Sequence, residues 1–315
     1  FWLKCERLAF PSECTMCEIR EGELAYFVNA RGEKIQTKTW HPDGDPVAIV
    51  VFLHGYTMST TDNRAWQRVA EAHTARGFLC GGLDYPGHGG SEGRRHHVED
   101  IALIADDVLQ FLEAELLPRH PGLPVFLRSQ SLGGLVALAA ALRRPQLFQG
   151  LALGAPPYEL RVLPDLWLRL RRHAISLGAA FLHEHVGELS VPLAVFQGVE
   201  DWTVSPTGAR RLVQAATSVD RALYLYKDMG HNMSMEPDIL DWLSLRLAAG
   251  NEKPARGAGA AAVLCARRPL PGAPWPPPPG SGDAAAGTEM QELLQADDQA
   301  RLLDELLGCW GAGPL

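Results

Sequence analysis

The chain has 315 residues, of which 46% are hydrophobic, and its formal net charge is −8 at pH 7. A chain of this length and composition can bury a large core and is typical of one α/β domain. The negative charge argues against nucleic acid as the main partner. All apolar runs are too short to cross a bilayer, which takes about 20 residues.

Residues 1–23 are predicted to form an N-terminal extension with no secretory signal. The scattered cysteines do not resemble a disulfide framework; they are Cys5, Cys14, Cys17, Cys80, Cys265 and Cys309. Reduced thiols indicate a cytoplasmic protein, but a chain that begins with phenylalanine leaves open a preceding targeting segment. Cys14 and Cys17 have the spacing of half a zinc site, yet no matching pair lies near them. We therefore expect no metal and no cofactor.

The first strong strand signal is the apolar run Val47–Leu53, which is followed by His54-Gly55-Tyr56. A loop of this kind supplies one of the two backbone N–H donors of an oxyanion hole, which binds the charged oxygen of an acyl-transfer intermediate. Gly55 lets the backbone turn inward, so the Tyr56 N–H is the candidate donor. His54 is interpreted as a structural histidine that braces the loop.

The segment Ser129-Gln130-Ser131-Leu132-Gly133-Gly134 lies between an apolar run, 124–127, and an alanine-rich helical stretch. A serine among small residues at a strand-to-helix junction indicates a sharp, strained turn that lifts the hydroxyl above a sheet. Ser131 is therefore the candidate nucleophile, and the dipole of the following helix favours developing negative charge. The Leu132 N–H is the candidate second donor of the oxyanion hole.

An insert of about residues 156–190 is predicted to form a short helical cap. Its first helix has an apolar stripe with arginines among it, and the stripe gives the candidate pocket residues Leu163, Trp167 and Leu170. A second, mostly apolar helix is expected from Ile175 to Leu182. The first helix has two interpretations, a basic lid that touches lipid or a membrane surface, and an ordinary helix packed on the core. The tripeptide His183-Glu184-His185 is weak evidence for a metal.

Two later motifs supply the partners that a serine nucleophile needs. Asp201 follows the strand-like run Val191–Gly198, and His231 follows a second run, Ala222–Tyr226. The order Ser, Asp, His is the one that this type of elbow demands, and it places all three groups at the carboxyl edge of one parallel sheet. His231 would act as the base and Asp201 would orient it. Glu200 is the alternative acid.

These motifs resemble the monoglyceride lipase and lysophospholipase family of α/β-hydrolases, which are cofactor-independent serine esterases. The resemblance runs from about Tyr26 to Leu247 and includes the signature Leu83–Gly93, in which His88 is interpreted as structural. It implies an α/β-hydrolase fold, with a mostly parallel sheet flanked by helices and a short helical cap. The chain departs from the family in having Ser129 where a glycine is usual, and in its shortened cap.

The hydrolase domain is predicted to span residues 24–250. The segment 251–287 is rich in alanine, proline and glycine and is expected to be a disordered linker. Residues 288–315 then show the pattern of an acidic amphipathic helix, which docks on the catalytic domain or on a partner protein, or is a weakly formed tail.

The sequence thus predicts a serine hydrolase that cleaves lipid-like monoacyl esters, such as a monoacylglycerol or lysophospholipid. Small-ester or thioester hydrolysis, peptide cleavage and acyl transfer are alternatives that use the same three side chains. A catalytically silent binding protein and a scaffold that acts through its tail are alternatives from other classes. Epoxide hydrolase and dehalogenase chemistry is disfavoured, because those relatives have aspartate at the position of Ser131.

Overall fold

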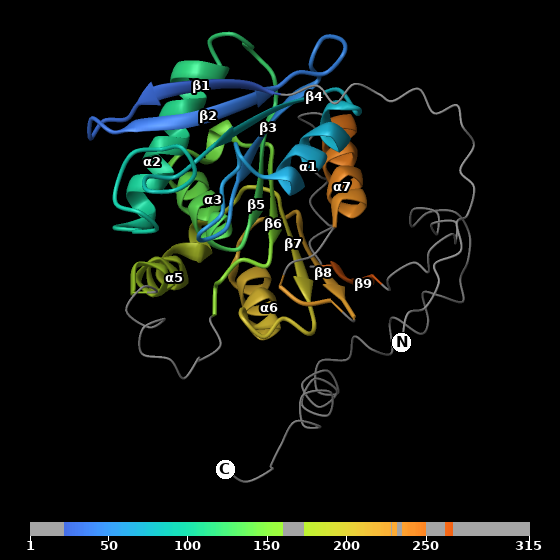
Figure 1. The fold of residues 1–315 in the computed structure, drawn as a ribbon. Coiled ribbons are helices and arrows are strands. Elements are labelled where there is room, and N and C mark those ends of the chain that lie inside the picture. Colours follow the sequence, from blue (N-terminus) through green and yellow to red (C-terminus); the bar gives the residue numbers. More distant parts are fainter. Residues whose placement is uncertain (1–21, 160–172, 228, 232–234, 250–261, 267–315) are drawn as a thin grey trace, which may run out of the picture. The chain divides into compact units, whose positions relative to one another are not determined.

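A nine-stranded, mostly parallel sheet forms the centre of the hydrolase domain (Figure 1). The structure is a computed structural model, and it describes residues 22–159, 173–227, 229–231, 235–249 and 262–266. The strands are β1 (Glu23–Val28), β2 (Lys34–Trp40), β3 (Ala48–Leu53), β4 (Phe78–Leu83), β5 (Val125–Gln130), β6 (Gly150–Gly154), β7 (Leu193–Gly198), β8 (Arg221–Tyr226) and β9 (Ala262–Ala266).

The strands lie in the order β1-β2-β4-β3-β5-β6-β7-β8-β9. β2 pairs antiparallel with β1 and with β4, and every other pair is parallel. The central strands are buried on both faces, as the six residues of β3 are, which accounts for their continuous apolar runs. The expected fold class, an α/β-hydrolase with a mostly parallel sheet flanked by helices, is confirmed.

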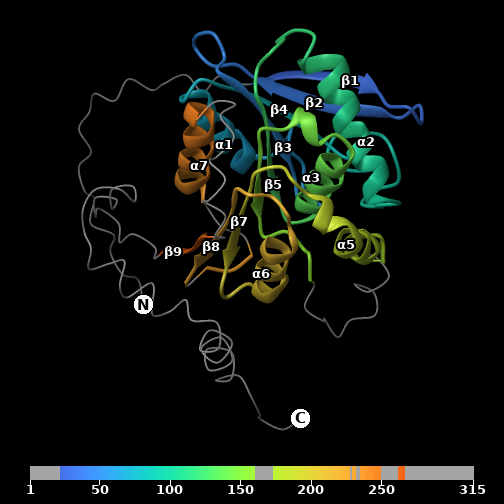
Figure 2. The ribbon, with the colours of Figure 1, turned by 180° about the vertical axis from the view of Figure 1, so that it is seen from behind.

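Helices cover both faces of the sheet, as the two opposite views show (Figures 1 and 2). On one face lie α2 (Ile101–Phe111), α3 (Leu132–Arg143), α5 (His173–His185) and α6 (Pro206–Ala215), whose buried side chains share one core cluster. On the other face α1 (Arg64–Thr74) and α7 (Glu236–Ala249) contribute to a second cluster. Short helical turns at Leu112–Leu116, Pro145–Leu147 and Val186–Glu188 complete the described elements.

The predicted second cap helix, from Ile175 to Leu182, lies within α5. It packs on α2 and α3, and Leu182 is buried in their core cluster. A Cβ on Gly178 would lie 2.5 Å from Ile101 Cγ1, so α5 and α2 approach closely. The expected insert 156–190 lies between β6 and β7, and its residues 160–172 lie outside the described part.

β9 falls inside the segment 251–287, for which the sequence predicts a disordered linker. Its sequence Ala-Val-Leu-Cys-Ala is a short apolar run, and it pairs in parallel with β8 from Ala222↔Ala262 to Tyr226↔Ala266. At these five residues the structure differs from the prediction, because an apolar pentapeptide can pair with the open edge of β8. The predicted extension 1–23, up to Glu21, and the helix predicted for 288–315 lie outside the described residues.

None of the helices in the described part of the chain has the length and apolar character that a bilayer crossing requires.

Candidate active site

The turn between β5 and α3 holds Ser131 in a strained conformation. Its backbone has φ 51° and ψ −120°, a region that side-chain-bearing residues rarely adopt. The close packing around the turn excludes side chains, since a Cβ on Gly133 would lie 2.2 Å from the Leu53 carbonyl oxygen and one on Gly134 would lie 2.7 Å from Pro156 Cβ. Ser129 is fully buried at the position where a glycine is usual.

The structure brings Ser131, His231 and Asp201 into one chain of hydrogen bonds. His231 Nε2 lies 3.0 Å from Ser131 Oγ, and His231 Nδ1 lies 2.7 Å from Asp201 Oδ2. Ser131 and His231 remain partly exposed, whereas Asp201 is fully buried. With the Nδ1 proton donated to the carboxylate, Nε2 faces the serine as a proton acceptor.

Asp201 is saturated with hydrogen bonds. Oδ1 accepts from the backbone N–H groups of Thr203 and Val204, both at 2.9 Å, and Oδ2 accepts from His231 and from Gln197 Nε2 at 3.0 Å. Burial opposes ionisation of this carboxyl, but the hydrogen bonds outweigh it and lower its pKa from the ordinary value. Asp201 is therefore the ionised partner of His231.

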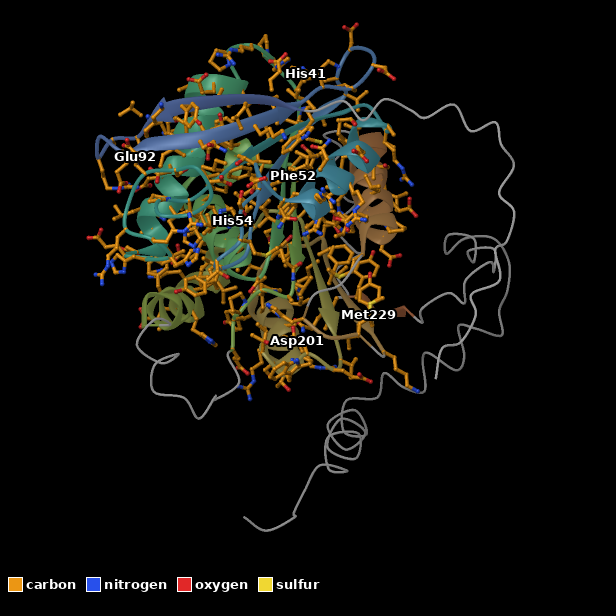
Figure 3. All side chains as sticks on the ribbon, in the orientation of Figure 1. His41, Phe52, His54, Glu92, Asp201 and Met229 are labelled. Atoms are coloured by element: carbon orange, nitrogen blue, oxygen red, sulfur yellow. The ribbon has the colours of Figure 1, made fainter. Side chains whose placement is uncertain are left out.

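The alternative acid, Glu200, does not take part in this chain of hydrogen bonds. Its side chain is exposed, and its backbone N–H donates to the Met229 carbonyl oxygen at 3.0 Å. Figure 3 labels Asp201 and Met229, which follow β7 and β8 at the same edge of the sheet. A Cβ on Gly198 would lie 2.3 Å from the Met229 carbonyl oxygen, so this glycine lets the two loops meet.

The His54-Gly55-Tyr56 loop lies against Ser131. A Cβ on Gly55 would be 3.4 Å from Ser131 Cβ. The Gly55 carbonyl oxygen is held by the Met58 N–H at 3.1 Å and by His54 Nδ1 at 2.8 Å. Since C=O and N–H point in opposite directions across a trans peptide, the Tyr56 N–H faces away from these partners. The Leu132 N–H begins α3 directly after Ser131.

His54 (Figure 3) has the bracing role that the sequence predicts. Its Nε2 accepts a hydrogen bond from the Tyr85 N–H at 3.1 Å, so its proton is on Nδ1 and is donated to Gly55. The ring also stacks on Tyr85 at a centroid distance of 3.9 Å. Complete burial lowers the pKa of His54 to about 4, and the imidazole is therefore neutral at pH 7.

Asp84, in the signature segment Leu83–Gly93, is fully buried and accepts hydrogen bonds from two loops. Its carboxylate accepts hydrogen bonds from the Thr60 N–H at 2.8 Å and Thr61 Oγ1 at 2.6 Å on one loop, and from the Gly90 N–H at 3.1 Å on another. A Cβ on Gly89 would lie 1.7 Å from Asp84 Oδ2, so a residue with a side chain would not fit at this position. The motif thus ties the loop after β4 to the loop that carries Tyr56.

His88, in the same signature, is structural in this arrangement. Its Nδ1 lies 3.0 Å from the Pro86 carbonyl oxygen, and its ring is 5.3 Å from that of His54. Burial lowers the pKa of His88.

Two glutamines that the sequence analysis did not single out contact two of the three catalytic candidates. Gln197 donates to Asp201, as described above, and Gln130 Nε2 donates to the His231 carbonyl oxygen at 3.0 Å. Each lies on a buried strand next to a motif, and a polar amide in an apolar run is the signal that could have identified it.

The family described as serine aminopeptidase, S33 (Hydrolase_4) matches residues 44–177 and 173–238, which is more than half of the chain. The chain belongs to this family. It is a monoglyceride lipase-like α/β-hydrolase and a serine hydrolase of the carboxylic ester hydrolase class.

Relatives that are named by an activity align with most of this hydrolase. It is 27% identical to human monoglyceride lipase, with 74% of this chain and 94% of the relative covered. It is 24% identical to caffeoylshikimate esterase of Arabidopsis thaliana, with 68% and 80% covered. A monoglyceride lipase structure from Saccharomyces cerevisiae shares the fold, with a TM-score of 0.62, 19% identity and 71% and 95% of the two chains covered.

The comparison with human monoglyceride lipase also shows that this hydrolase is shortened. The alignment has 289 positions, whereas 74% of this chain is about 233 residues, so about 56 positions of the alignment have no residue here. The two segments of the family match meet at residues 173–177, where α5 begins. Both observations agree with a short connection between β6 and α5.

The described start of that connection, at Tyr158 and Glu159, is fixed to the hydrolase. Tyr158 stacks on His183 of α5 at a centroid distance of 3.8 Å, and its carbonyl oxygen lies 2.9 Å from His183 Nε2. Glu159 pairs with Arg211 of α6 at 2.6 Å and accepts the Ser205 N–H through its carbonyl oxygen. The predicted pocket residues, Leu163, Trp167 and Leu170, lie outside the described residues.

Proposed function

We propose that this hydrolase cleaves monoacyl lipid esters, such as a monoacylglycerol or a lysophospholipid, through an acyl-enzyme on Ser131. The observation that carries the proposal is the hydrogen-bonded chain Ser131–His231–Asp201 on a strained turn. The match to monoglyceride lipases supports the substrate class. No cofactor is needed for this chemistry, because the three side chains and two backbone N–H groups supply it.

In the first half of the reaction His231 Nε2 takes the proton of the Ser131 hydroxyl while Oγ attacks the carbonyl carbon of the ester. The N–H groups of Tyr56 and Leu132 bind the oxygen that becomes negative. The tetrahedral intermediate then expels the alcohol, which takes the proton from His231 as it leaves, and the acyl group remains on Ser131.

In the second half a water molecule replaces the alcohol. His231 takes one of its protons while the water oxygen attacks the acyl carbon, and the same N–H groups bind the oxyanion. The bond to Ser131 breaks, Oγ recovers its proton from His231, and the fatty acid leaves. Throughout, the Asp201 carboxylate stabilises the imidazolium without taking its proton.

The Ser131→Ala protein tests the mechanism. It should lose labelling by a fluorophosphonate probe and at least a thousandfold of its ester hydrolysis, because the nucleophile is gone. Ser244→Ala is the matched control, since Ser244 lies on α7 and bonds only to the Leu240 carbonyl oxygen in the described structure. Full labelling of Ser131→Ala, or none of the folded wild type, would contradict the proposal.

A second candidate function, hydrolysis of small or bulky esters, is favoured by the short connection between β6 and α5. A chain that lacks about 56 positions of the alignment with its lipase relative has less polypeptide with which to enclose an acyl chain. The similarity to caffeoylshikimate esterase fits a substrate of this kind.

A series of p-nitrophenyl esters, from acetate to palmitate, separates the two candidates. If this hydrolase encloses an acyl chain, kcat/KM should rise with chain length at least to decanoate, because each buried CH2 adds about 0.8 kcal/mol. A maximum at acetate or butyrate would support the small-ester function instead. If the hydrolase cleaves monoacyl lipid esters and residues 160–172 contact a lipid surface, turnover should be faster on micelles than on monomeric substrate.

A further inference from the structure

Gln130 links the strand of the nucleophile to the loop of the base. It is the last residue of β5, directly before Ser131, and only 8% of its surface is exposed. Its Nε2 donates to the carbonyl oxygen of His231 at 3.0 Å. Two adjacent residues therefore supply the serine hydroxyl and the side chain that donates a hydrogen bond to the His231 backbone.

The glutamine side chain has little freedom to move. It lies over Gly154, its partner across the sheet, where a Cβ would be 2.5 Å from Gln130 Oε1. The same Cβ would be 3.2 Å from the methyl carbon of Met235, which is also buried. Gly154 further accepts the Ser131 N–H through its carbonyl oxygen at 2.8 Å. The amide is thus confined against the backbone that positions the nucleophile.

A second side chain from the same face of β5 contacts the start of α7, the helix that follows His231. Arg128, two residues earlier, donates from Nη2 to Glu236 Oε1 at 2.8 Å and is 3% exposed. Its guanidinium also lies over the Trp66 ring at 5.2 Å. Because this ion pair anchors the start of α7 independently, removing the Gln130 amide should leave the fold intact.

We propose that Gln130 is a positioning residue that sets the distance between His231 and Ser131. The inference rests on the proposed function, in which His231 is the base. Proton transfer depends on this geometry, and misplacing a catalytic group by about 1 Å can cost on the order of a hundredfold in rate. Without the amide, the His231 backbone is free to move away from Ser131 while Asp201 still holds the ring.

The test compares Gln130→Met with Gln36→Met. Methionine keeps the length of glutamine but has no N–H donor. Gln36 is a matched control, since it is also 8% exposed and donates from Nε2, to Thr61 Oγ1 at 2.6 Å. With p-nitrophenyl butyrate as the substrate, kcat of Gln130→Met should fall at least tenfold with KM within twofold of wild type. Gln36→Met should keep the wild-type kcat.

Gln130→Glu separates the hydrogen bond from packing. It keeps the shape of the side chain but places a carboxylate oxygen against the His231 carbonyl oxygen, so its loss of kcat should equal or exceed that of Gln130→Met. Urea unfolding midpoints close to that of the wild type would show that the variants are folded. If Gln130→Glu retains the wild-type kcat, the hydrogen bond has no positioning role.

Fluorophosphonate labelling distinguishes failure of this inference from failure of the proposed function. If folded wild type is unlabelled, the proposed function is wrong. If wild type labels and Gln130→Met labels at the same rate, the function stands and the positioning role of Gln130 is wrong. We expect wild type to label and Gln130→Met to label at least tenfold more slowly, because the same proton transfer activates the serine.

Discussion

At the scale of single residues, the strained backbone of Ser131 has a cost in stability. A residue with a side chain at φ 51° is held there by its surroundings, at an expense of about 1–3 kcal/mol. Glycine adopts positive φ without this expense. The hydroxyl group is thus presented to the substrate by a conformation that the rest of the fold has to maintain.

This strain predicts that Ser131→Gly is more stable than Ser131→Ala by about 1 kcal/mol, after the greater chain entropy of unfolded glycine is subtracted. Both variants lack the proposed nucleophile, so a difference in activity does not enter the comparison. Urea unfolding at pH 7 measures the difference. A Ser131→Gly protein less stable than Ser131→Ala would show that the turn carries no strain.

At the scale of elements, α3 and β3 approach more closely than any side chain at Gly133 permits. The Gly133→Ala methyl group would lie 2.2 Å from the Leu53 carbonyl oxygen. The backbone would have to shift, which we expect to lower the free energy of unfolding by about 3 kcal/mol and to reduce kcat, because the Leu132 N–H moves with α3. Chemical denaturation and ester hydrolysis measure the two effects.

Gly187→Ala is the control for this prediction. Gly187 is exposed in the short turn Val186–Glu188, and a Cβ there would meet no atom within 4 Å. A surface change of this kind is expected to alter stability by less than about 0.5 kcal/mol. If the two alanine variants were equally stable, the close contact between α3 and β3 would not constrain the fold.

At the scale of the whole molecule, two buried histidines make stability depend on pH. Burial lowers the pKa of both His54 and His73 to about 4, below the ordinary value of 6.5. Between these values the unfolded chain binds more protons than the folded chain, so stability falls as the pH falls from 6.5 to 4. Each histidine should remove about 3 kcal/mol over this range, and below pH 4 their effect should level off.

Substituting His73→Leu should halve this part of the decline. His73 lies on α1 away from Ser131, and its Nε2 is buried without a hydrogen-bond partner in the described structure. The variant should therefore keep its ester hydrolysis at pH 7. Urea midpoints measured from pH 7 to pH 4 for both proteins check the slope, and parallel curves would contradict the prediction.

Much of the fold could be predicted because local sequence patterns indicate its strands and turns. The runs around β3, β7 and β8 are continuous and apolar, and the small residues of the turn at Ser131 marked a strand that gives way to a helix. The order of the motifs then placed Ser131, Asp201 and His231 at one edge of the sheet. The sequence leaves Glu200 as the alternative acid, and in the structure it is Asp201 that contacts His231.

The rest depended on contacts between distant parts of the chain. Composition predicted a linker around β9, because a single apolar pentapeptide has no periodicity of its own and needs the edge of β8. The apolar character of α5 is the same whether a helix caps a site or covers a sheet. The place of α5 in the fold is therefore known only from its packing on α2 and α3. The hydrogen bond of Gln130 likewise joins a strand to a loop about 100 residues away.

The position of β3 in the sheet also governs how the chain can fold. β3 lies between β4 and β5, and its pairing with β5 joins Ile49 to Val125, so the centre of the sheet cannot close until the chain has been ordered over a long loop. Pairings of this range make folding slow, typically milliseconds to seconds. Because the proposed catalytic residues Ser131, Asp201 and His231 follow β5, β7 and β8, a refolding chain should regain catalysis only after these three strands have paired. Recovered activity is therefore a stricter measure of renaturation than recovered helix content.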